Sequence, residues 1–130
     1  MEFEISFPGG LRVDANVFGQ VVPTDQPVMA GGSGSAPAPF TLFLASIGTC
    51  AGIYVLHFCK TRGIPTEGVR ILQRIAGRPD QTLGAVELEI EVPATFPEKY
   101  HSAILRAADQ CAVKKVMENP PAFNTRVSVV

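Results

Sequence analysis

Two cysteines carry the chemistry that this sequence suggests. Cys50 lies in the apolar stretch 41–57, and Cys111 lies in the stretch 107–115. Both stretches predict helices, so each thiol would be held on a rigid element. Such a pair is the minimum set for a two-cysteine redox cycle, in which peroxide oxidises one thiolate to a sulfenic acid and the other thiol resolves it as a disulfide. The sequence alone leaves open whether the two sulfur atoms meet.

Other thiol and imidazole chemistry has weaker support. Cys59 follows Cys50 by nine positions, which places it on the opposite helix face after a rise of roughly 13 Å, too far for a disulfide. We therefore expect Cys59 to be a packing residue. His57 lies roughly 10 Å along the helix from Cys50, too far for a Cys–His nucleophile and base. No Cys-x-x-Cys or His-x-x-x-His spacing occurs, so we expect no metal and no cofactor.

A reactive cysteine also needs a lowered pKa, and an arginine is a common way to stabilise its thiolate. Arg12, just after the turn Gly9-Gly10, is the single arginine before the first predicted helix. Six further arginines follow it in the chain, and residue type and spacing alone do not choose among the seven: Arg62, Arg70, Arg74, Arg78, Arg106 and Arg126.

Length and composition predict one globular domain over residues 1–130. The chain has 46% hydrophobic and 18% charged residues, a net charge of −1, and no long basic run. These values argue against disorder and against binding to nucleic acid or to an anionic membrane surface. Three widely spaced cysteines are a poor disulfide framework, so we expect a reducing cytoplasm. The opening Met-Glu-Phe-Glu has no basic segment leading into an apolar one, so we expect no signal peptide.

The stretch 40–59 has the length of a membrane span and no charged residue. Polar and small residues dilute it: Thr41, Ser46, Gly48, Thr49, Gly52 and His57. The remaining chain is patterned as sheet and helix. We therefore prefer a buried central helix to a membrane span.

Hydrophobic periodicity and turn residues predict an α+β domain in which helices pack on antiparallel sheet. The Gly-rich segment 27–39 reads as a flexible loop, short enough for an active-site lid. A capping box at Thr95–Glu98 predicts the start of the second helix. The expected elements are strands at 2–7 and 11–22, a helix from Pro39 to Arg62, strands at 68–76 and 84–92, a helix from 95 to 119, and a strand at 124–130.

Three segments together resemble the OsmC/Ohr family. They are Pro39-Phe-Thr-Leu-Phe-Leu-Ala-Ser-Ile-Gly-Thr-Cys50, then Arg62-Gly63-Ile64, then Asp109-Gln-Cys111-Ala-Val-Lys-Lys. In that family a proline opens a long central helix, and a cysteine follows eleven residues later. A second cysteine lies in a later helix. The resemblance covers essentially the whole chain.

This resemblance implies an OsmC-like fold and an intertwined homodimer with its sites at the subunit interface. It also implies reduction of organic hydroperoxides, with Cys50 as the peroxidatic and Cys111 as the resolving cysteine. The Cys50 thiolate would attack the peroxide, an alcohol would leave, and an external dithiol would reduce the Cys50–Cys111 disulfide. Arg12 is the best match to the arginine that contacts the reactive thiol in the family.

The sequence departs from the family at one position. Hydroperoxide-reducing members carry a glutamate directly after the helix-opening proline, where it orients the arginine, and here that residue is Phe40. Two alternatives to a peroxidase therefore remain. One is a non-catalytic OsmC-like protein that binds a small apolar ligand at the dimer interface. The other is a structural domain with incidental thiols.

Overall fold

A computed structural model describes all residues of the chain, 1–130. The chain divides into two compact units, Met1–Ala45 and Ser46–Val130. The helices and strands follow in the order β1 (Glu4–Gly9), β2 (Arg12–Val17), β3 (Gln20–Val22), η1 (Val28–Ala30), α1 (Pro39–Thr61), β4 (Arg70–Gly77), β5 (Leu83–Glu91), η2 (Glu98–Tyr100), α2 (His101–Ala108) and α3 (Ala112–Glu118). This is the α+β arrangement with antiparallel strands that the sequence predicts.

The first unit is built on an antiparallel sheet with the order β1-β2-β3. A tight hairpin turn divides the stretch 11–22, and its residues Phe18 and Gly19 both have positive φ, 52° and 81°. Two positive φ angles are the signature of the turn whose twist matches paired strands. Val17 pairs with Gln20 on either side of this turn, so the stretch 11–22 forms two strands.

The Gly-rich segment after β3 is organised around a buried carboxylate, contrary to the flexible loop that its composition predicts. Asp25 is 1% exposed. It accepts hydrogen bonds from the backbone N–H groups of Gln26 and Ser35 and, at 2.6 Å, from the Ser35 hydroxyl. These donors hold the pKa of Asp25 below its ordinary value. Only glycine fits at position 32 of this loop, because a Cβ there would lie 2.0 Å from the Gln26 carbonyl oxygen.

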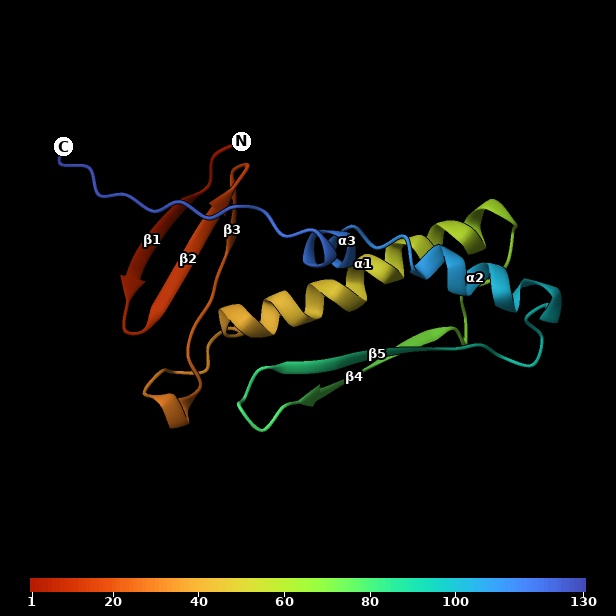
Figure 1. Ribbon diagram of the computed structural model, residues 1–130. Coiled ribbons are helices and arrows are strands. Elements are labelled where there is room, and N and C mark those ends of the chain that lie inside the picture. The colour runs from red at the N-terminus through yellow and green to blue at the C-terminus, as the bar shows by residue number, and fades with distance from the viewer. The chain divides into compact units, whose positions relative to one another are not determined.

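The second unit packs the C-terminal part of α1 against the β4–β5 hairpin and α2 (Figure 1). Its core contains eight buried residues: Ala51, Val55, Phe58, Cys59, Phe96, Ile104, Ala108 and Cys111. The hairpin presents Ile71, Leu88 and Ile90 to this core. On the charged face of the hairpin, Arg74 pairs with Glu89 at 2.6 Å, and Arg70 pairs with Glu91.

Helix α1 begins at Pro39, as predicted, and Gly63 closes it in the left-handed conformation with φ 63°. It is buried along one stripe and not on all sides within this chain. By length and composition α1 alone is apolar enough to cross a bilayer, with a mean hydropathy of 1.8 and 28% of its most apolar window buried. Core helices of soluble proteins pass the same test.

Three expected local structures are wrong. The helix expected from 95 to 119 is divided into η2, α2 and α3. No side chain caps η2, whose N-cap is Pro97, so the expected capping box does not form. Residues 124–130 form no strand, because no neighbouring strand of this chain pairs with them and their backbone groups have no ladder to join.

Candidate active site

The structure brings two of the three predicted site residues together. Cys50 and Cys111 both belong to the unit 46–130, and the Cys111 side chain is near enough to Cys50 to help lower the pKa of its thiol. Arg12 belongs to the other unit, 1–45. All three cysteines are free thiols. The two cysteines that the sequence singled out therefore lie within one unit of the structure.

Helix α1 holds Cys50 at the edge of its buried stripe. Ala51 and Val55 point into the core, and Cys50 packs against it while staying partly exposed. A residue beside the buried stripe has its backbone fixed by packing and its side chain open to a small reactant. This setting suits a nucleophile better than that of Cys59, which is fully buried.

The sequence around Cys111 predicts that it lies in the middle of a helix, but the structure places it between two helices. Helix α2 ends at Ala108, and α3 begins at Ala112. Cys111 is the N-cap of α3, with φ −47° and ψ 119°. The Lys114 ammonium bonds Asp109 at 3.1 Å across the break.

Because the helix is broken before Ala112, the first backbone N–H groups of α3 lie near the Cys50 sulfur. The first N–H groups of a helix have no partner within it and carry a partial positive charge. The pKa of Cys50 lies below the 9.0 of an ordinary cysteine, chiefly because the backbone N–H of Val113 hydrogen-bonds its sulfur. Burial opposes this effect, and the Cys111 side chain and the Ala112 N–H add to it. The thiolate is therefore favoured by groups of the same unit.

The Cys111 thiol has two possible acceptors. In the structure it donates to the Ile47 carbonyl oxygen at an S–O distance of 3.7 Å. Turned toward Cys50, the same proton stabilises the thiolate. One proton serves one acceptor at a time, so ionisation of Cys50 draws the Cys111 thiol toward it. The Cys111 thiol thus has an acceptor at Cys50 as well as at Ile47.

Cys59 is confirmed as a packing residue. It is fully buried in the core near the end of α1. Burial raises the pKa of its thiol, and the nearby Arg62 guanidinium only partly offsets this. A buried thiol that resists ionisation is chemically inert.

Arg12 has a carboxylate partner that the sequence analysis missed. Its Nη2 donates to Asp14 Oδ2 at 3.0 Å, and Asp14 is nearly buried. The spacing of Arg12 and Asp14 could have indicated this ion pair, because residues two apart in a strand share a face. Arg12 Nε and Asp14 Oδ1 are buried without a further partner. Phe40 instead stacks on Phe43, with ring centroids 5.7 Å apart, so the position after the helix-opening proline carries an aromatic contact.

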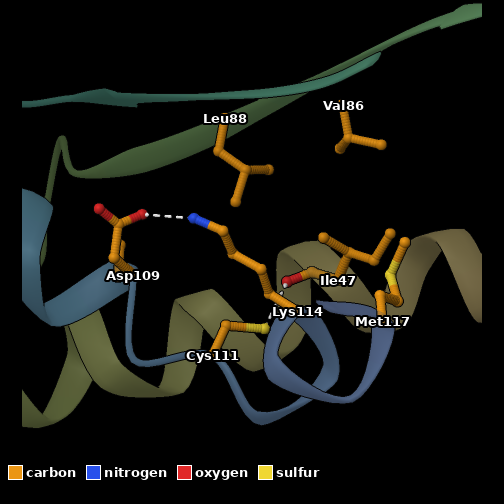
Figure 2. Close-up of a pocket in the computed structure, with 8 residues that line it drawn as sticks. Ile47, Val86, Leu88, Asp109, Cys111, Lys114 and Met117 are labelled. Atoms are coloured by element: carbon orange, nitrogen blue, oxygen red, sulfur yellow. Dashed lines mark hydrogen bonds and ion pairs between the residues drawn. The ribbon is translucent and has the colours of Figure 1, made fainter. Parts of the chain in front are cut away.

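No group of three or more His, Cys, Asp or Glu side chains is arranged to hold a metal ion. A pocket of about 190 Å³ lies beside Cys111 in the second unit. Figure 2 shows it between α3 and the β5 residues Val86 and Leu88.

Comparison with protein families gives one match. The model of the family described as OsmC-like protein matches residues 32–126 of the chain. No curated protein matches the sequence.

Solved structures share the fold at low sequence identity. One is a candidate osmotic-stress-induced and detoxification-response protein from Psychrobacter arcticus 273-4, with 22% identity, a TM-score of 0.66, and coverage of 87% of this chain and 85% of that one. A second is an organic hydroperoxide resistance protein from Legionella pneumophila, with 18% identity, a TM-score of 0.53, and coverage of 90% and 89%. A third, from Vibrio cholerae, is a candidate organic hydroperoxide resistance protein with captopril in one active site, with 19% identity, a TM-score of 0.54, and coverage of 92% and 86%.

Proposed function

Because this chain belongs to the OsmC-like protein family, we propose that it is a thiol-dependent peroxidase that reduces organic hydroperoxides through Cys50 and Cys111. The observation that carries the proposal is the Cys50 sulfur, which is partly exposed, has the Val113 N–H as the chief cause of its lowered pKa, and lies near the Cys111 side chain. Two solved structures with this fold are named for organic hydroperoxide resistance, which agrees with that chemistry.

The reaction has three steps. The Cys50 thiolate attacks one peroxide oxygen, the O–O bond breaks, and the alkoxide leaves as an alcohol after it takes a proton. The Cys111 sulfur then attacks the sulfenic sulfur of Cys50, so that a disulfide forms and water leaves. An external dithiol finally exchanges with the disulfide and returns both cysteines to thiols. We propose the cytoplasm as the compartment, because such a cycle needs a supply of reduced thiol.

The test is one turnover followed by peptide mapping. Reduced protein is treated with one equivalent of cumene hydroperoxide, alkylated, and digested without reductant. We expect a Cys50–Cys111 disulfide to form rapidly, with Cys59 still free and unreacted. Persistence of all three free thiols after prolonged exposure contradicts the peroxidase and favours an OsmC-like protein that binds an apolar ligand without turnover.

We further propose that Arg12 assists the Cys50 thiolate, held in its orientation by Asp14 in place of the family glutamate. Support comes from the ion pair at 3.0 Å and from Phe40, which offers no carboxylate. Arg12→Met is expected to slow peroxide reduction about tenfold, the cost of roughly 1.4 kcal/mol of lost charge stabilisation. Single-turnover stopped-flow kinetics measures this. Arg78→Met, in the β4–β5 turn, is the matched control, and equal rates in both variants would remove Arg12 from the site.

A homodimer is the proposed assembly. Large apolar side chains stand exposed in the single chain, among them Ile53 on α1 at 44% and, in the tail, Phe123 at 87% and Val127 at 94%. Contiguous apolar surface left exposed on a single chain marks an association surface, and we propose that these side chains contribute to one. Light scattering after size exclusion is expected to give about twice the 13.9 kDa of one chain. Val127→Asp is expected to shift the equilibrium toward the single-chain mass, and a monomeric wild type would contradict the dimer.

A further inference from the structure

The buried carboxylate of the first unit holds together residues that are ten positions apart. Asp25 is 1% exposed. Its two oxygens accept hydrogen bonds from the Gln26 N–H at 2.7 Å, from the Ser35 N–H at 3.0 Å and from the Ser35 hydroxyl at 2.6 Å. A buried charge is costly unless it is hydrogen-bonded. These three bonds therefore favour the closed form of the loop that follows Asp25.

The residue before this carboxylate is bonded to the strand that carries Arg12. The Val13 N–H donates to the Thr24 carbonyl oxygen at 3.2 Å, and the Thr24 hydroxyl donates to the Val13 carbonyl oxygen. Val13 directly follows Arg12 in β2. The backbone on one side of Arg12 is thus tied to the residue that enters the loop.

The loop also contacts the residue on the other side of Arg12. A Cβ at Gly31 would lie 3.5 Å from Leu11 Cδ1, so the Leu11 side chain lies against the loop backbone there. At its far end, the Asp25 N–H donates to the Pro37 carbonyl oxygen at 3.3 Å, two residues before α1 begins. The loop therefore joins both neighbours of Arg12 to the start of α1.

We propose that Asp25 is a positioning residue for Arg12: its carboxylate holds the loop 26–35 closed, and the closed loop fixes the backbone on either side of Arg12. The inference rests on the proposed role of Arg12 in assisting the Cys50 thiolate. Asp14 holds the guanidinium through Nη2. A long side chain held at one nitrogen depends on its backbone for the direction in which it extends, which is why the loop matters.

The first experiment measures the effect on β2 without any reaction. Asp25→Asn keeps the side-chain shape but turns one acceptor oxygen into an NH2 group that faces a donor. We expect the Val13 amide, which is bonded to Thr24, to exchange its hydrogen at least about tenfold faster, the weight of one hydrogen bond to a charged group. The amides that join β1 and β2 should stay protected. Hydrogen exchange followed by NMR measures both, and unchanged exchange at Val13 overturns the inference.

Asp80→Asn is the matched control. Asp80 accepts from the Thr82 N–H at 3.0 Å and from its hydroxyl at 2.6 Å, as Asp25 does from Ser35, but it lies in the β4–β5 turn of the second unit. We expect it to leave the Val13 amide unchanged. Ser35→Ala is a milder variant that removes one of the three donors, and we expect a smaller acceleration at Val13. If Asp25→Asn unfolds the unit, Ser35→Ala decides the inference, and unchanged exchange in it would overturn the proposal.

The second experiment asks whether the effect reaches Cys50. Iodoacetamide alkylation of Cys50 over a pH series gives the midpoint of thiolate formation in wild type, Asp25→Asn, Arg12→Met and the double variant. Loss of Arg12 is expected to raise the midpoint by about one pH unit, the equivalent of tenfold. Because Asp25 acts through Arg12, Asp25→Asn should raise it by no more than that, and the double variant should match Arg12→Met. Additive shifts overturn the inference, since general destabilisation would add.

The outcomes separate this inference from the proposals on which it rests. A wild-type midpoint in Arg12→Met overturns the role of Arg12, while exchange at Val13 still decides whether Asp25 holds the strand. Thiols that do not react with hydroperoxide overturn the peroxidase alone, because neither experiment uses a peroxide. A midpoint that moves in Arg12→Met but not in Asp25→Asn, despite faster exchange at Val13, overturns the positioning role alone.

Discussion

Cys50→Ser is expected to abolish hydroperoxide reduction, with a loss of at least about 10³-fold, as for other enzymes that lose their nucleophile. The hydroxyl of serine stays protonated at neutral pH and does not attack the O–O bond. Turnover of cumene hydroperoxide with a dithiol reductant measures the loss, and non-reducing peptide mapping checks that no disulfide forms.

Cys59→Ser is the matched control on the same helix. Cys59 is fully buried and its pKa is raised, so we expect this variant to lose stability and to keep its rate per folded molecule. Equal inactivation by the two substitutions, or an active Cys50→Ser protein, would contradict the assignment of Cys50 as the nucleophile. In the latter case the thiols would be incidental to the domain.

The second large effect concerns the backbone of α3. Ala112→Pro removes an N–H that helps to lower the pKa of Cys50. Proline suits the first position of a helix, and the extended ψ of Cys111, 119°, suits a residue before proline. We therefore expect the fold to persist, the pKa of Cys50 to rise, and its alkylation at neutral pH to slow by at most about tenfold, the upper value for one hydrogen bond to a charged group.

Ala112→Gly separates the lost donor from a weakened helix. Glycine destabilises the helix start but keeps the N–H. Iodoacetamide alkylation followed over a pH series gives the midpoint of thiolate formation for both variants. We expect the midpoint to move upward in Ala112→Pro and to stay in place in Ala112→Gly. A shift of equal size in both would mean that helix stability, and not the donated hydrogen bond, governs the thiolate.

The order of the main elements through β5 and the position of Cys50 on α1 could be predicted from the sequence. Pro39 and Gly63 mark both ends of α1 by local chemistry, and the alternation of valine, leucine and glutamate fixes β5. Each of these features depends only on neighbouring residues in the chain, so it can be recognised in a single sequence. The pairing of Cys50 with Cys111 required the resemblance to a family, because it joins residues far apart in the chain.

The missed features depend on contacts between distant residues. The break before α3 is one, because Ala112, Val113 and the following lysines are all compatible with an unbroken helix. The loop around Asp25 is another: its glycines and serines read as flexible until the carboxylate that orders them is seen. The tail 124–130 alternates as a strand does, but a strand needs a partner, and none pairs with it in this chain.

The donors at the start of α3 also influence the redox equilibrium of the pair. They stabilise the thiolate of the reduced form and have no charge to stabilise once both sulfurs are joined. A couple whose reduced form is favoured in this way has a raised reduction potential, so its disulfide is an oxidant that gives up its bond readily. In the proposed cycle, a thiol pool would therefore reduce this disulfide more readily than that of a pair without these donors.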